Sequence, residues 1–337
     1  ALKAYVEVVM DAKKLFLGTG ASTDYFCGNV YGEAYSAYNR YKYWFRVMPI
    51  NSTALGGSQI YEMAFLKGYL EFVLGKNITE VAILREGLDW TTPMDNALQS
   101  ILPGLGFNIV LDIDYPITAT GTDFATYWTQ IQAAGAQIVV PVISAQGGLY
   151  MMSQYADLQP KCLIVGIDVQ SQLDTFWEDT GGTDVIVGDC AYEVIMQSVY
   201  NTSKTALTIP FWNDFFDTFG HEPLYTAVGA YDAVTLIGDG INATGRFKSE
   251  ALITWLEGFD RDNPRTGWSV STGSSAWNPS HDVVSSIEAG WPYGCTLYCQ
   301  WQTDGTKNVI SSGNLLYPDS IVTGPLTLPP WGINDAP

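Results

Sequence analysis

Basic residues are scarce in this sequence. Its 337 residues include 16 lysines and arginines but 35 aspartates and glutamates, which gives a formal net charge of −19 at pH 7. Nucleic-acid-binding surfaces need clustered lysine and arginine to contact phosphates, and an anionic membrane face makes a similar demand. The charge balance therefore excludes nucleic acid as a partner, and the acidity indicates solubility in an exposed setting.

Histidine and the motifs of common catalytic and cofactor sites are also lacking. The two histidines, His221 and His281, have no nucleophile elbow or metal-ligand spacing near them. Neither a Walker pattern nor a dinucleotide fingerprint follows an expected strand. We therefore predict that both histidines are surface residues, and that the protein is not an enzyme and holds no metal and no cofactor.

Long hydrophobic runs are absent as well. Hydrophobic residues make up 47% of the chain, but no apolar run is long enough to span a bilayer. The length suffices for two domains of ordinary size, each with its own core. We therefore look for a globular protein of two domains.

The five cysteines form no metal or framework pattern. An odd number leaves at least one thiol free or paired outside this sequence. Cys162 and Cys190 begin and end two apolar runs that would be neighbours in one sheet, so a disulfide between them is left open. Cys295 and Cys299 are too far apart to bridge one another in an extended strand.

Four N-x-[ST] sequons occur where loops or element ends are expected. Because glycan acceptors lie on exposed loops of secreted proteins, the sequons point to the cell exterior, as a secreted or membrane-anchored protein. The predicted glycosylation sites are Asn51, Asn77, Asn201 and Asn242.

Short apolar runs are what the sequence has in quantity between residues 80 and 169. They lie at 81–84, 109–111, 138–143 and 162–167, with longer amphipathic segments between them. Continuous β-branched runs of this kind are typical of strands buried on both faces of a parallel sheet covered by helices. Open sheets of that kind bind ligands outside the carboxyl ends of their strands, where this chain has Trp90, Ser144 and Asp168.

The rest of the chain alternates in the same way. Further strands are expected at 15–17, 43–47 and 184–190, and a closing hairpin at 295–302 and 308–310. Helices are expected at 1–12, 57–74, 92–102, 123–134, 147–158, 211–219, 225–241 and 249–258, the last capped by Ser249. A Gly- and hydroxyl-rich loop at 18–23 can present N–H groups and hydroxyls to a carboxylate.

The order of these pieces resembles the type I periplasmic binding proteins, particularly the branched-chain amino-acid receptors of ABC importers. The resemblance spans nearly the whole chain and depends on the order of several weak motifs. These are the loop at 18–23, the strand at 43–49, the strand at 81–84 with Asp89-Trp90 after it, the helix start at 121–124, the helix at 230–234, the hairpin at 297–305 and the tail at 328–331.

The resemblance implies an α/β fold of two lobes, each a mostly parallel sheet flanked by helices. Lobe 1 would take residues 1–48 and 192–292, lobe 2 residues 49–191 and 293–310, and residues 311–337 would form an irregular tail. The family begins with roughly three βα units before the point where this chain begins, and an open half-sheet is unstable. Lobe 1 is therefore expected to be incomplete, and to be completed by a separate amino-terminal segment or by a neighbouring subunit.

The resemblance also implies an extracellular receptor that captures an amino acid or a similar small solute by clamshell closure and delivers it to the membrane permease of an ABC importer. The ligand-binding residues that it implies are Gly20, Ala21, Ser22, Thr23, Trp90, Ser144, Asp168 and Tyr231. The loop would hold the ligand's carboxylate and Asp168 its ammonium group, through charge-assisted bonds. Trp90 and Tyr231 would supply aromatic walls. Because the family often has tyrosine at the positions of Trp90 and Ser144, the ligand's side chain stays open.

A second hypothesis uses the same fold differently. The sequons, the acidic aromatic-rich composition and the incomplete first lobe also fit a glycosylated cell-surface or extracellular filament subunit that a neighbouring segment completes. Electron microscopy of the native material would distinguish regular polymers from monomers.

Overall fold

The computed structural model describes residues 2–31 and 37–334. The chain divides into two compact units, and each is described by itself. Unit 1 comprises Ala1–Leu55 and Asn201–Cys295, and unit 2 comprises Gly56–Tyr200 and Thr296–Pro337.

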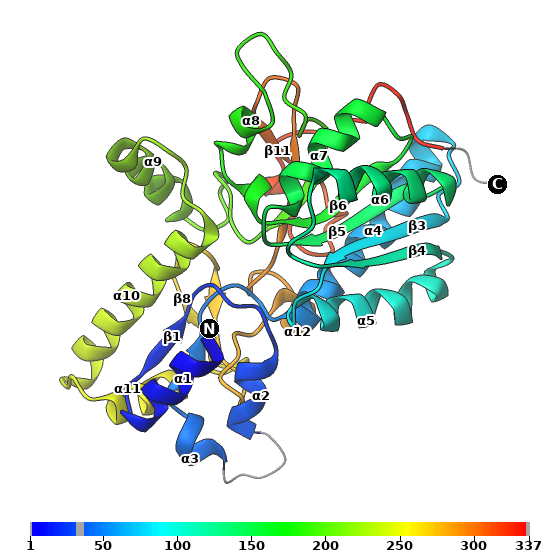
Figure 1. Ribbon diagram of the computed structural model, residues 1–337. Helices are drawn as coiled ribbons and strands as arrows, with labels where there is room; N and C mark the ends of the chain where they lie inside the picture. The colour runs from blue at the N-terminus through cyan, green and yellow to red at the C-terminus, as the bar shows by residue number, and fades with distance from the viewer. Residues whose placement is uncertain (1, 32–36, 335–337) are drawn as a thin grey trace. The chain divides into compact units, whose positions relative to one another are not determined.

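Unit 2 is built on a sheet that has seven strands in the described part of the chain, in the order β11-β10-β7-β6-β5-β3-β4 (Figure 1). Neighbours from β4 through β7 are parallel, whereas β10 runs antiparallel to both β7 and β11. The strands are β3 (Glu80–Glu86), β4 (Asn108–Tyr115), β5 (Ile138–Ile143), β6 (Leu163–Asp168), β7 (Val194–Gln197), β10 (Leu297–Trp301) and β11 (Lys307–Val309). The predicted α/β class, the four apolar strands and the closing hairpin are thereby confirmed.

Helices cover both faces of this sheet, which is why its central strands β5 and β6 are almost entirely apolar. Every residue of β5 and β6 is buried. In Figure 1, α6 and α7 lie over one face and α4 and α5 over the other, and side chains of α6 and α7 share a core with Ala82, Val139 and Ile164. The helices are α4 (Ser52–Leu74), α5 (Thr91–Ile101), α6 (Gly121–Ala133), α7 (Gly147–Leu158) and α8 (Phe176–Asp179), with short 3-10 turns η2 (Leu102–Leu105), η3 (Gln170–Gln172) and η4 (Asp319–Ile321).

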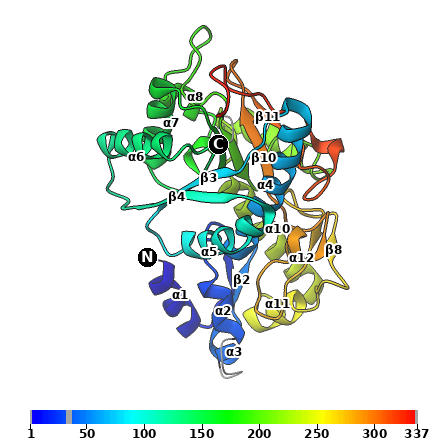
Figure 2. The same ribbon diagram turned by 90° about the vertical axis from the view of Figure 1, so that its right-hand side faces the viewer.

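Unit 1 contains the parallel pair β1 (Phe16–Gly18) and β2 (Trp44–Arg46), which confirms the two strands predicted at 15–17 and 43–47. Figure 2 shows the early segment (blue) beside the later one (yellow to orange), and the two share an aromatic core that includes Trp44, Phe45, Trp268 and Trp277. The other elements are α1 (Leu2–Asp11), α2 (Tyr25–Tyr31), α3 (Tyr38–Tyr41), α9 (Thr208–Phe219), α10 (Tyr225–Thr244), α11 (Ser249–Leu256), β8 (Arg265–Thr266), β9 (Ser274–Ser275) and α12 (Ser286–Ala289).

The strand predicted over 184–190 is wrong. Its apolar residues form a turn in which the Thr183 hydroxyl accepts the N–H groups of Val185 and Ile186, and Val185 is 91% exposed. The strand that pairs with β6 is instead β7, which begins after the buried Glu193. A β-branched run predicts a strand only where a neighbouring strand is available to pair with it.

One helix start and one helix cap also differ from the prediction. The helix predicted from residue 57 begins at Ser52, because the Asn51 side-chain oxygen accepts the Ala54 N–H at 2.8 Å. Ser249 does not cap α11, whose N-cap position is Lys248. The Ser249 hydroxyl instead accepts the Leu15 N–H at 3.1 Å and so ties α11 to the start of β1.

Candidate functional site

Three predicted ligand-binding residues follow the carboxyl ends of parallel strands in unit 2: Trp90 after β3, Ser144 after β5, and Asp168 at the end of β6. The structure joins the first two through Glu86, the buried last residue of β3. The Glu86 carboxylate accepts the Ser144 hydroxyl, the Ser144 N–H at 2.8 Å, the Ala145 N–H at 3.1 Å and the Trp90 indole N–H at 3.1 Å. Sequence reasoning missed Glu86, although a carboxylate that directly follows a buried strand was a usable signal.

Asp168 is fully buried and only partly hydrogen-bonded. Its Oδ1 accepts the N–H groups of Gln170 at 3.0 Å and Ser171 at 3.4 Å, whereas its Oδ2 has no partner. Its carboxylate lies under the first turn of α7, where a Cβ at Gly148 would overlap it, so glycine is required there. Burial raises the pKa of Asp168 to about 7, these two N–H groups oppose the rise, and the charge of Glu86 adds to it.

A second buried carboxyl, Glu193, lies near Asp168. The Ser171 hydroxyl donates to Glu193 Oε2 at 2.5 Å and itself accepts the Trp301 indole N–H at 2.8 Å. The other oxygen of Glu193 has no partner. Burial raises the pKa of Glu193, and the charge of Asp168 raises it further.

Tyr115, the last residue of β4, adds a buried phenol to this edge. Its hydroxyl has no partner and lies against Gly147, where a Cβ would overlap it. Burial raises the pKa of Tyr115, as do the charges of Glu86 and Asp168. Sequence reasoning missed both Tyr115 and Glu193. We call six residues the carboxyl-edge cluster: Glu86, Tyr115, Ser144, Asp168, Ser171 and Glu193. Asp168, Glu193 and Tyr115 each keep one oxygen without a hydrogen-bond partner. The oxygens of Asp168 and Glu193 are acceptors when these carboxyls are ionised.

The predicted carboxylate-binding loop of unit 1 is anchored by a buried arginine. The Arg46 guanidinium donates to the backbone oxygens of Ala21 and Thr23, the latter at 2.7 Å, and to Asp282 Oδ1 at 2.6 Å. The other oxygen of Asp282 accepts the Asn51 amide at 2.8 Å. The loop is thus held by its main chain, which leaves its side chains out of the anchor.

Further contacts restrain the same loop. The backbone oxygen of Ser22 accepts the Ser52 N–H at 2.8 Å, at the start of α4. The backbone oxygen of Gly20 accepts the Tyr225 hydroxyl at 3.1 Å, at the start of α10. Tyr231, the predicted aromatic wall, lies further along α10, is 50% exposed and packs its ring on Phe211 at a centroid distance of 4.7 Å. The aromatic residue bonded to the loop is therefore Tyr225.

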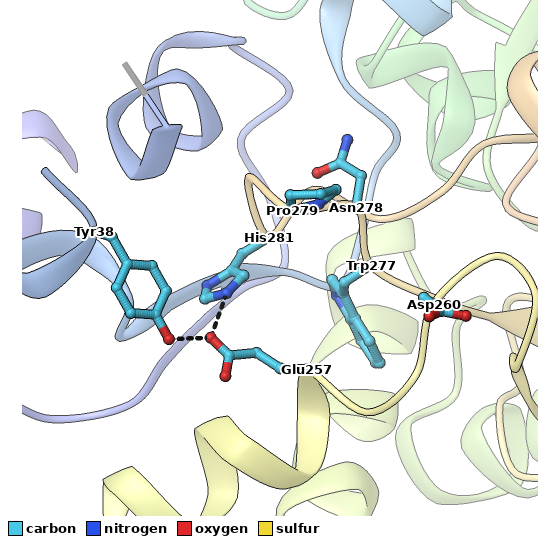
Figure 3. Close-up of a pocket in the computed structure, with 7 residues that line it drawn as sticks. All are labelled: Tyr38, Glu257, Asp260, Trp277, Asn278, Pro279 and His281. Atoms are coloured by element: carbon cyan, nitrogen blue, oxygen red, sulfur yellow. Dashed lines mark hydrogen bonds and ion pairs between the residues drawn. The ribbon is translucent and has the colours of Figure 1, made fainter. Parts of the chain in front are cut away.

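Unit 1 also has a pocket of about 370 Å³ (Figure 3). It is lined by Tyr38, Glu257, Asp260, Trp277, Asn278, Pro279 and His281. In Figure 3 the hydroxyl of Tyr38 and the imidazole of His281 both point to one oxygen of Glu257. The polar groups at this end of the pocket are therefore bonded to one another.

His281 itself is 3% exposed, so the prediction of a surface histidine is wrong for this residue, whereas His221 is exposed as predicted. The His281 ring stacks on Phe45 at 3.8 Å, and its Nδ1 lies 3.0 Å from the backbone oxygen of Trp44. Burial lowers the pKa of His281, and Glu257 opposes that shift. The aromatic core of unit 1 thus uses this histidine as a packed, bonded ring.

The family model described as periplasmic binding protein matches residues 1–281. The chain belongs to the periplasmic binding protein family. The resemblance that the sequence motifs carry is confirmed, and membership implies a solute-binding protein that works outside the cytoplasm and is not an enzyme.

Solved structures show the same type I fold for this periplasmic binding protein. A putative branched-chain amino acid ABC transporter protein from Silicibacter pomeroyi is 15% identical and has a TM-score of 0.73, over 98% of this chain and 79% of that one. A solute-binding protein from R. palustris in complex with benzoate is 13% identical, with a TM-score of 0.67 over 91% and 72%. A leucine-, isoleucine-, valine-, threonine- and alanine-binding protein from Brucella ovis is 14% identical, with a TM-score of 0.64 over 86% and 64%. No curated protein matches the sequence.

Over residues 2–31 and 37–334 of the periplasmic binding protein, no three His, Cys, Asp or Glu side chains come together as a metal site. In the same described part, no helix is long and apolar enough to cross a membrane.

The cysteines and sequons take up specific places. All five cysteines are buried, and Cys162 and Cys190 are not bridged to one another in this structure. Burial raises the pKa of Cys190 to about 12. Among the predicted glycosylation sites, Asn51 already uses both ends of its amide, on Asp282 and on the Ala54 N–H. The other three asparagines, Asn77, Asn201 and Asn242, are exposed.

Proposed function

We propose that this periplasmic binding protein is the receptor of an ABC importer and captures an amino acid by clamshell closure, with a membrane permease as its partner. The two units would be its lobes. The residues proposed to meet the ligand are Gly20, Ala21, Ser22, Thr23 and Tyr231 in unit 1 and Trp90, Ser144 and Asp168 in unit 2.

The observation that carries the proposal is the unused acceptor capacity of the carboxyl-edge cluster. Asp168 and Glu193 each keep one buried oxygen without a partner. Buried polar groups are nearly always hydrogen-bonded, so such groups need a donor from water or a ligand. An ammonium group supplies several donors together with the opposite charge. Asp168 ends β6 and Ser144 follows β5, at the carboxyl ends of strands, where open α/β sheets bind ligands. Glu193 precedes β7 and reaches Ser171, beyond β6, through its side chain.

The same cluster selects between the ligand classes named for similar structures. The Brucella ovis protein is described as a leucine-, isoleucine-, valine-, threonine- and alanine-binding protein, and the R. palustris protein was solved with benzoate. Both classes carry a carboxylate, but only the amino acid carries an ammonium group. An ammonium group beside Asp168 would favour the ionised form of that buried carboxyl, whereas the carboxylate of benzoate would be repelled by it, so the cluster favours an amino acid.

A thermal-unfolding panel tests the proposal. The wild-type protein is heated with each standard amino acid, with benzoate and with 3,4-dihydroxybenzoate, the last being the ligand of another similar structure. We expect stabilisation by at least one amino acid, about 2.7 kcal/mol when the ligand is at 100 times its Kd. Its 2-keto analogue, in which a carbonyl oxygen replaces the amino group and the α-hydrogen, is the matched control and should give no shift.

Each other outcome argues against a specific part of the proposal. Stabilisation by benzoate alone would exchange the amino acid for an aromatic acid. An equal shift with the 2-keto analogue would remove the ammonium group from recognition. No shift with any compound would contradict the receptor function, and would leave the glycosylated surface or filament subunit as the hypothesis to pursue by electron microscopy.

A further inference from the structure

We propose that Glu86 is the positioning residue of the carboxyl-edge cluster. Its carboxylate holds the Trp90 indole and the turn at Ser144 and Ala145 in the geometry that a ligand meets. This inference rests on the proposed function only where ligand affinity is concerned. The positioning itself concerns groups within unit 2.

Four donors converge on the Glu86 carboxylate. Oε1 accepts the Ser144 N–H, the Ser144 hydroxyl and the Trp90 indole N–H, and Oε2 accepts the Ala145 N–H. The acceptor is buried, so water does not compete for these bonds. A carboxylate is the one side chain that offers two oxygens and no donor, which is the requirement of four donors pointing inward.

The two segments that Glu86 joins follow the neighbouring strands β3 and β5 and lie far apart in the chain. Trp90 lies four residues further along the chain, whereas Ser144 is 58 residues away, between β5 and α7. An indole has a single donor, so the bond to Glu86 selects the orientation of the Trp90 ring. The N–H groups of Ser144 and Ala145 lie between β5 and α7, and both donate to the Glu86 carboxylate. One carboxylate therefore sets two sections of the proposed wall.

Glu86 and Asp168 have different roles by the same reasoning. The acceptor sites of Glu86 are taken by protein donors, so it has little to offer a ligand. Asp168 keeps a buried oxygen without a partner. The charge of Glu86 also acts on Asp168 and raises its pKa. Neutralising Glu86 should thus move a titration as well as a geometry, and a residue that only fills space would not do so.

The test compares Glu86→Gln with Glu80→Gln. Glu80 is a matched control because it is also buried, lies at the other end of β3 and accepts hydrogen bonds from Thr79 and Asn108. Hydrogen exchange at the Ser144 and Ala145 amides is measured without ligand. Glutamine turns a donor toward one of the four donors, so we expect at least a tenfold loss of protection at these amides in Glu86→Gln and none in Glu80→Gln. Glu86→Asp keeps the charge and should recover part of the protection.

Two further readouts separate positioning from mere stability. The Asp168 carboxyl, followed by NMR, should titrate at a lower pH in Glu86→Gln than in wild type and at an unchanged pH in Glu80→Gln. With L-leucine as the calorimetric probe, Glu86→Gln should bind at least tenfold more weakly than Glu80→Gln. Should Glu86→Gln not fold, Glu86→Asp serves for amide protection and leucine binding, and should lose part of each because its side chain is shorter. Since this variant keeps the charge, its Asp168 titration should stay at the wild-type pH.

The outcomes are distinguishable. Preserved amide protection together with an unchanged Asp168 titration in Glu86→Gln would overturn the inference, whatever the ligand result. Loss of protection with no leucine binding by wild type supports the positioning role, and leaves the amino-acid panel to decide the proposed function. Equal leucine binding by both variants, with protection lost in one, would show that the turn is positioned by Glu86 but is not read by leucine, and would overturn the link to recognition.

Discussion

In unit 1 the buried guanidinium of Arg46 faces a buried carboxylate, Asp282, and the oxygens of that carboxylate are bonded on both sides. In unit 2 the carboxyls of Asp168 and Glu193 are equally buried, yet each keeps an oxygen that no protein group bonds. A charge that is fully paired holds its surroundings without outside help. A charge left short of partners costs stability and persists where a ligand or water can supply the missing donor.

The paired charges of unit 1 give the largest expected effect. Arg46→Met leaves Asp282 buried without its cation and should lower the free energy of unfolding by about 3–5 kcal/mol in a urea titration. Arg40→Met removes an exposed arginine bonded to Glu7 and Asp11, and should cost much less in the same titration, because solvent screens exposed pairs. Similar costs for the two variants would contradict the contrast between buried and exposed pairs.

Gly148 allows a sharper test of the crowding around Asp168. Gly148→Ala places a methyl group on the Asp168 carboxylate, and we expect a loss of about 1–3 kcal/mol in the same titration. Gly121→Ala is the control, because it also lies in the first turn of a helix, α6, but its added Cβ would meet Tyr150 at an ordinary 3.7 Å. A neutral Gly148→Ala would mean that Asp168 can move away freely.

The unpaired carboxyl should appear as a pH dependence. Folding raises the pKa of Asp168 to about 7, so the folded protein keeps this proton over a range in which the unfolded chain has lost it. The contribution of Asp168 to stability therefore falls as the pH rises from about 4 to about 7 and then levels off. Asp168→Asn does not titrate, so the stability of this variant relative to wild type should increase over that interval in urea titrations.

Asp123→Asn provides the opposite case. The bonds from the N–H and hydroxyl of Thr120 lower the pKa of Asp123, so its contribution is lost only as the pH falls below the ordinary range of a carboxyl. Between about pH 5 and pH 7 the stability difference from wild type should stay constant. If the stability difference from wild type changed with pH for Asp123→Asn but not for Asp168→Asn, Asp168 would not be the carboxyl whose pKa folding raises.

A smaller effect than that of Arg46→Met is expected at Asn51, which belongs to the paired side of the comparison. Asn51→Ala removes both the cap of α4 and the amide on Asp282, and should cost about 1–2 kcal/mol. Glycopeptide mass spectrometry of native protein should find Asn51 unmodified, because a sugar on its amide nitrogen would disturb the bond to Asp282. A glycan at Asn51 in folded protein would show that this bond is dispensable.

Sequence reasoning succeeded where local pattern is sufficient. The runs at 81–84 and 138–143 are continuous and β-branched, and they form central strands because helices cover both faces. It failed where the outcome depends on a distant partner. Residues 184–190 carry a strong strand pattern but no neighbour pairs with them, whereas Val194–Gln197 pairs with both β6 and β10.

The candidate site was predictable by place and not by connection. Trp90, Ser144 and Asp168 lie at strand ends, as the alternation of strands and helices implied. The hydrogen bonds that join Trp90 and Ser144 to Glu86 could not be predicted, because Ser144 is 58 residues away from Glu86 in the chain. His281 was misread for the same reason: an Asn-Pro-Ser-His segment looks like a surface turn until Phe45 and Trp44 pack around it.

Arg46 holds the loop at 18–23 through main-chain oxygens, and this bears on redesign of the loop. Its bonds go to the carbonyl oxygens of Ala21 and Thr23, which every amino acid possesses. Side chains at these positions can therefore be exchanged while the main chain keeps its course. Under the proposed function, variants at Ala21 and Thr23 would therefore test whether the side chains of this loop set ligand selectivity without moving its backbone.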